Sequence, residues 1–135
     1  MAVTPNSMIL PQAIRHTSAV CTVGKTTYND GTNAVLLVAG GANNSFMRRL
    51  TAIPRATIAT NMQLQLYSFD GTNYNFIDSV LMTAYTMAQT TAVPVADFGY
   101  SDSNVRYLPS GLSFYVAIGI SQAAGIVFNA GIGDY

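Results

Sequence analysis

The sequence predicts an all-β protein, an antiparallel β-sandwich or jelly roll with an extended N-terminal arm. Three observations support this prediction. Apolar and polar residues alternate at period two in several segments, and clusters rich in Gly, Asn and Asp separate those segments. The helix–strand rhythm of a parallel sheet is absent. About seven or eight short strands with turns between them are typical of a sandwich.

The first 16 residues predict an arm. Pro5 and Pro11 break a helix and remove donors from a β-ladder, so we expect residues 1–16 to be extended and residues 17–135 to form one domain. The arm carries an apolar triplet and a basic residue that we expect to contact a neighbouring protein. These residues are Met8, Ile9, Leu10 and Arg15.

The next segments predict three strands. Residues 18–27 are rich in Thr and Val and end in a turn over residues 28–33. Residues 34–39 form a short apolar run, as in a strand buried on both faces. Residues 46–53 lead to Pro54, which is expected at a strand end or a sheet edge, and residues 56–60 can resume the strand.

The middle of the chain contains the clearest hairpin. Met62, Leu64 and Leu66 alternate with polar or amphipathic residues, and the loop over residues 69–73 precedes a returning strand at residues 74–80. Residues 79–89 are ambiguous because their apolar spacing also fits one short helix. Residues 90–109 are irregular, with a brief strand expected near residues 105–108.

The C-terminal part shows the strictest alternation. Apolar residues occupy every second position of residues 112–120 and again of residues 126–132. The connection from Gln122 to Gly125 is short enough for a hairpin between these two strands. Small residues on the opposite face, Ala117, Gly119 and Gly131, permit close approach by another layer.

Composition limits the possible functions. In 135 residues the charged residues make up only 9% and the formal net charge is zero, so we expect neither nucleic acid nor membrane as a partner. A surface this poor in charge favours self-assembly, because soluble monomers usually carry more charge. One cysteine and no signal peptide indicate synthesis in the cytoplasm.

No residue pattern predicts catalysis, so we expect a protein that is not an enzyme and has no cofactor. His16 is the only histidine and Cys21 the only cysteine, which is too few for a zinc site. A triad would need His16, at the end of the arm, as its base. Asp97, Asp102, Ser103 and Asn104 place several oxygen atoms in one loop, but the spacing of a calcium-binding EF-hand is missing. We therefore predict no catalytic and no metal-binding residues.

The arginines give the one local concentration of charge. Arg48, Arg49 and Arg55 lie within eight residues and are candidates for docking on an acidic protein surface, although solvation or pairing within the domain explains them as simply. Tyr100 and Tyr107 lie in the irregular region, where they can stack on sugar rings. A carbohydrate-binding module is therefore a competing interpretation.

Several segments resemble small β-rich proteins encoded in the structural gene modules of tailed phages and prophages. They are LTAIPRAT (residues 50–57), QLQLY (63–67), DFGYSD (97–102) and AAGIVFNAGIGDY (123–135). None of these segments is a catalytic motif. The resemblance implies a virion component and assigns no functional residue.

Within that group, small sandwich proteins often resemble head decoration or cement proteins. The resemblance then implies a homo-oligomer, expected to be a trimer, that binds the major capsid protein and stabilises the phage head. The alternative is a tail-associated or receptor- and carbohydrate-binding sandwich. The location that follows is the virion.

Overall fold

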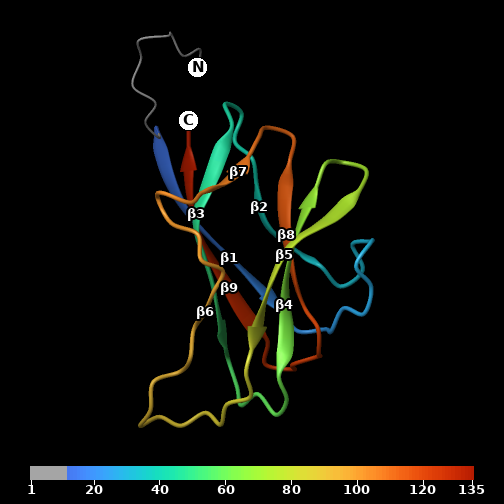
Figure 1. Ribbon diagram of the computed structural model, residues 1–135, viewed down its shortest axis with the longest axis vertical. Coiled ribbons are helices and arrows are strands. Elements are labelled where there is room, and N and C mark those ends of the chain that lie inside the picture. Colours follow the sequence, from blue (N-terminus) through green and yellow to red (C-terminus); the bar gives the residue numbers. More distant parts are fainter. Residues whose placement is uncertain (1–11) are drawn as a thin grey trace.

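A computed structural model describes residues 12–135, which form a β-sandwich of two antiparallel sheets without any helix in this range. Figure 1 shows the two sheets as facing layers of an elongated molecule. The strands are β1 (Ala13–Cys21), β2 (Val35–Ala39), β3 (Ser45–Pro54), β4 (Met62–Phe69), β5 (Tyr74–Met82), β6 (Ala96–Asp97), β7 (Arg106–Leu108), β8 (Ser113–Ile118) and β9 (Ile126–Asp134). The predicted sandwich is confirmed.

Sheet A has the order β1-β9-β3-β6, and sheet B has the order β2-β8-β4-β5. The short strands β6 and β7 pair with the same edge of β3, one after the other, and act together as one interrupted edge strand. The chain crosses repeatedly from one sheet to the other. The only hairpin between consecutive long strands of one sheet is β4–β5, as the sequence predicts.

Alternation places the core between the sheets. The side chains that point inward are fully or almost fully buried, and they include most of the residues whose period-two spacing predicted strands. Examples are Leu64 and Leu66 of β4, Phe114 of β8, and Phe128 and Ile132 of β9. Burial of these side chains is the main term that holds the two sheets together.

The edges of the sandwich are closed by polar contacts. On one side Arg15 donates two hydrogen bonds to the Asp134 carboxylate, at 2.6 and 2.9 Å, and one to the carbonyl of Ala39 in the other sheet. On the other side Tyr100 donates to Asp78, and Arg106 donates to a backbone carbonyl of β5. The bonds to Ala39, to Asp78 and to β5 link the edges of the two sheets, whereas the Arg15–Asp134 pair lies within sheet A.

Three local predictions are wrong, and one open alternative is decided. The first strand begins at Ala13, not at residue 18, so residues 13–16 belong to sheet A rather than to an arm. Residues 79–89 form no helix, since β5 continues to Met82 and an extended loop follows. Leu36 is 49% exposed because β2 is an edge strand, so that segment is not buried on both faces.

The third error concerns the last two strands. The predicted hairpin between them does not form, because β8 pairs with β2 and β4 in sheet B whereas β9 pairs with β1 and β3 in sheet A. The short connection crosses the sandwich instead. Among the residues that the structure describes, no helix is long and apolar enough to span a membrane.

Candidate interaction surface

The outer faces of the two sheets differ in how much they are covered. The loop between β1 and β2 lies over the outer face of sheet B, beside β4 and β5 (Figure 1). The outer face of sheet A keeps long rows of exposed side chains, including Ile14 at 65% and Tyr107 at 70% exposed. Sheet A therefore keeps an exposed outer face in the described chain.

A buried polar cluster explains how the loop holds to sheet B. The Lys25 side chain is fully buried, forms an ion pair with Asp30 at 2.7 Å and lies over the ring of Tyr67 at 5.2 Å. This pairing holds the pKa of Asp30 at about 2, with a second hydrogen bond from Thr27. Lys25 is therefore not free to bind a partner, because its charge is paired inside the domain.

The same cluster continues along β4. Tyr67 is fully buried and its hydroxyl donates to the side-chain oxygen of Gln65 at 2.5 Å, while Gln65 donates to Gln63. Burial raises the pKa of Tyr67 to about 12. The loop residue Tyr28 also donates to Gln63 and stacks on Phe76. The alternation in β4 indicated one core face, yet Gln65 and Tyr67 on the other face are also buried.

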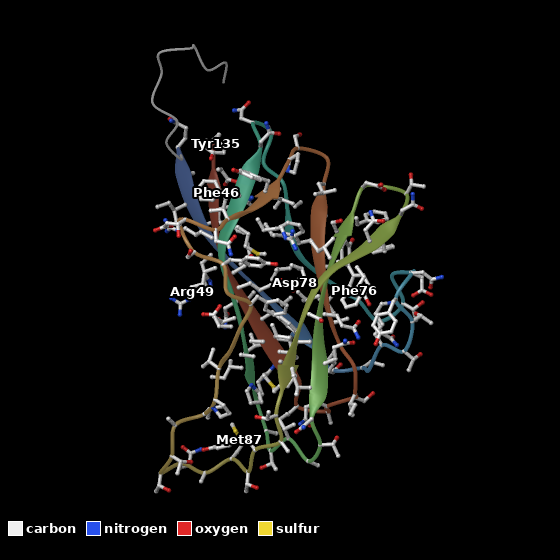
Figure 2. The ribbon with its side chains drawn as sticks, in the orientation of Figure 1. Phe46, Arg49, Phe76, Asp78, Met87 and Tyr135 are labelled. Carbon is white, nitrogen blue, oxygen red and sulfur yellow. The ribbon has the colours of Figure 1, made fainter. Side chains whose placement is uncertain are left out.

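On sheet A, one outward row is apolar. Ile14, Gly133, Phe46 and Tyr107 are directly paired across β1, β9, β3 and β7, so their side chains share one face. The neighbouring row contains core residues such as Ile132, which places the Phe46 row on the outside. Figure 2 shows Phe46 beside the ring of Tyr135, whose centroid lies 5.4 Å away.

A β-bulge in β3 shapes the next part of this face. Met47 pairs with Ile132 and Arg49 pairs with Gly131, so Arg48 is the extra residue. The bulge brings Arg48 and Arg49 to the same outer face, where regular alternation would separate them. Gly131 lies below both, because a Cβ built on it would be 3.6 Å from Arg49 Cβ and 3.8 Å from Arg48 Cγ.

The loop between β6 and β7 forms a wall opposite the bulge. Together they enclose an open concavity of about 500 Å³. Its lining residues are Arg48, Arg49, Asp97, Tyr100, Ser101 and Asp102. We call this concavity, together with the adjacent Gly131, the bulge site.

The bulge site combines two charges of each sign, but few of them are paired with each other. Arg48 approaches Asp102 at 3.7 Å, and the Asp102 side chain is 85% exposed. Asp97 accepts a hydrogen bond from the backbone of Gly99 at 2.8 Å. No ion pair involves Arg49 within residues 12–135. Figure 2 shows Arg49 directed away from the ribbon.

The structure treats the predicted interaction residues differently. Met8, Ile9 and Leu10 lie outside the described residues. Arg15 is used inside the domain, in the pair with Asp134, and Arg55 is exposed at the end of β3 beyond the bulge site. Only Arg48 and Arg49 come together.

The other residues considered as site candidates lie on different parts of the domain. His16 is exposed on β1. Cys21 is buried in the core, and burial raises the pKa of its thiol to about 12, so it is a poor nucleophile. The Tyr100 hydroxyl is bound to Asp78, and Arg106 lies over its ring, whereas Tyr107 is free at the surface.

The sequence signal for the bulge site was incomplete. The arginines were visible as a local cluster, but the acids that face them lie 48 or more positions further along the chain. Nothing in the sequence marks the bulge. In the described part of the chain, no three His, Cys, Asp or Glu side chains gather as a metal-binding group. Comparison with protein-family models, curated proteins and solved structures gives no match for this chain.

Proposed function

We propose that this chain is a structural virion protein of a tailed phage, a decoration or cement protein that binds the capsid lattice as an oligomer and stabilises the head. The observation that carries the proposal is the exposed outer face of sheet A, with its apolar row at one end. That row lies directly beside the point where the N-terminal segment joins β1, since the amide of Gln12 still bonds to Asp134.

The physical case rests on the exposed apolar side chains at one end of this face. Ile14 and Tyr107 are more than three-fifths exposed, and covering such side chains stabilises a complex by about 25 cal/mol per Å² of apolar surface removed from water. Each copy would bind modestly. Many copies on one lattice, joined in trimers, would add up to a large effect on the particle.

Imaging of native particles tests the location. Density for this sandwich on the head, in trimers at repeated lattice positions, is the expected result, and density restricted to the tail would refute the decoration proposal. Particles that lack the protein should lose their genome at a lower temperature than decorated particles. Sedimentation of the purified chain tests the trimer separately.

The role of the N-terminal segment needs a variant that keeps the sandwich intact. Deletion of residues 1–11 retains Gln12 and therefore the first hydrogen bond of the β1–β9 ladder, at 2.6 Å. The truncated protein should unfold at the same temperature as the full chain but occupy particles poorly. Equal occupancy of particles by both proteins would refute a role of the arm in binding.

A carbohydrate-binding function is the second candidate, and the observation in its favour is the exposed ring of Tyr107 near a polar concavity. The structure makes Tyr107→Ala the informative variant, because Tyr100 is tied to Asp78 and its removal would disturb the fold. Specific binding on a glycan array that Tyr107→Ala abolishes would favour this second function.

A further inference from the structure

The bulge site contains two guanidinium groups on neighbouring residues that the fold directs to one side. Regular alternation would have sent one of them inward, so the bulge at Arg48 creates the pair. Like charges this close repel each other, and an anion between them relieves the repulsion. Guanidinium groups bind carboxylates especially well, because two parallel N–H donors match the two carboxylate oxygens.

The surroundings leave room for such an anion. Gly131 places no side chain between the arginines, and a Cβ there would meet them only at ordinary van der Waals distances of 3.6 to 3.9 Å. The Arg48 side chain lies across the glycine, because its Cγ and Nε would be 3.8 and 3.9 Å from that Cβ. A larger residue at this position would push on the Arg48 side chain without removing either charge.

The acids of the domain do not satisfy the arginines. Asp102 is 85% exposed and stands 3.7 Å from Arg48, and exposed pairs of this kind contribute at most about 1 kcal/mol. One oxygen of Asp97 is engaged by a backbone amide. A carboxylate from outside, brought in with its own apolar neighbours, would be better shielded from water than either acid.

The apolar row supplies that shielding. Phe46 and Tyr107 lie one outward row further along the sheet, about 7 Å from the bulge by the spacing of alternate strand residues. An extended partner segment with an acidic residue two positions from an apolar one would reach both features at once. Tyr and Arg are also the residues that most often dominate protein–protein binding energies.

We propose that the bulge site binds a side-chain carboxylate of a protein partner between Arg48 and Arg49, while Phe46 and Tyr107 receive an apolar side chain of the same segment. This inference rests on the proposed function, since it names the part of the domain that meets the capsid protein. The partner segment that fits this site carries an acidic residue two positions from an apolar one.

The test measures binding of purified protein to native particles that lack it. The double variant Arg48→Ala/Arg49→Ala should bind at least tenfold more weakly, and the loss should shrink as salt weakens the wild-type complex. Arg55→Ala is the matched control, because it removes an exposed arginine just past the C-terminal end of β3, outside the site, and it should bind within twofold of wild type.

A second pair of variants separates the placement of the arginines from their charge. Gly131→Val places a branched side chain against Arg48 and Arg49 at an outward strand position and, by displacing them, should weaken binding with both charges retained. Ser79→Val places a branched apolar side chain at an exposed position of β5, in the other sheet, and should leave binding unchanged. Circular dichroism and thermal unfolding confirm that each variant is folded.

The outcomes distinguish the two proposals. Wild-type binding that neither Arg48→Ala/Arg49→Ala nor Gly131→Val weakens would refute the carboxylate site while leaving the decoration function standing. Failure of the wild-type protein to bind any particle would overturn both. Binding of a glycan that the double variant loses would replace the protein partner by a carbohydrate.

Discussion

Removal of one hydroxyl group should show how strongly the loop between β1 and β2 depends on its buried polar cluster. Tyr67→Phe keeps the aromatic ring, so no cavity forms. It removes the donor to the side-chain oxygen of Gln65, which is 1% exposed and has no other donor in the described structure. A buried acceptor left without a partner costs about 1–3 kcal/mol.

The second contact of this hydroxyl adds little. The carbonyl of Thr27 lies 3.3 Å away, and Thr27 is exposed, so water can replace the bond. We therefore expect Tyr67→Phe to lower the free energy of unfolding by about 2 kcal/mol. For a domain of 135 residues this corresponds to a fall in Tm of about 7 °C.

Urea unfolding followed by circular dichroism measures the change, with equal slopes required for the two proteins. Tyr107→Phe is the control, because its hydroxyl is at an exposed position and should change stability by less than about 0.5 kcal/mol. Adding Gln65→Met to Tyr67→Phe should recover most of the loss, since both polar partners are then gone. Equal stability of the two phenylalanine variants would contradict the reasoning.

Two further predictions concern pH and backbone space. Hydrogen bonds from its arginine partner lower the pKa of Asp134 below 3.8, so the stability that this carboxylate provides is complete above pH 3.8 and is lost as the pH falls through the lowered value. The free energy of unfolding should therefore depend less on pH in acid for Asp134→Asn than for the wild type. Asp30 and Asp70, whose pKa values are also lowered, supply the remaining slope. Gly40→Ala should destabilise the protein far more than Gly71→Ala. A Cβ at Gly40 would lie 2.2 Å from a backbone carbonyl oxygen, whereas Gly71 has a φ of +96° and open space around it. Similar falls in Tm for the two variants would show that the backbone at Gly40 relaxes.

The strands with one buried face could be predicted because burial imposes a period of two on the sequence. Residues 112–120, 126–132 and 62–66 show this period, and their inward residues form the core. The first strand was misjudged because its early part is exposed on an edge, where Arg15 and His16 are tolerated. Alternation carries no information there.

The pairing of strands was harder to predict than their positions. Gln122 to Gly125 can join two strands of one sheet or cross between two sheets, and only the long-range partners of β8 and β9 decide between these arrangements. The bulge site was hidden for the same reason. The extra residue Arg48 has no local sequence marker, and its neighbour Asp102 is brought to it by pairing of β6 and β7 with β3.

The central position of β9 in sheet A has a consequence for how the chain folds after synthesis. The nine residues of β1 pair with β9 alone, and β2 pairs with β8 alone, so both must wait for partners translated about 80 residues or more later. Only the β4–β5 hairpin can close locally. Such non-local topologies fold slowly and leave apolar strand edges exposed on the nascent chain. The nascent chain therefore stays largely unpaired until β8 and β9 have been translated, and its yield in the cell is expected to depend on the supply of chaperones.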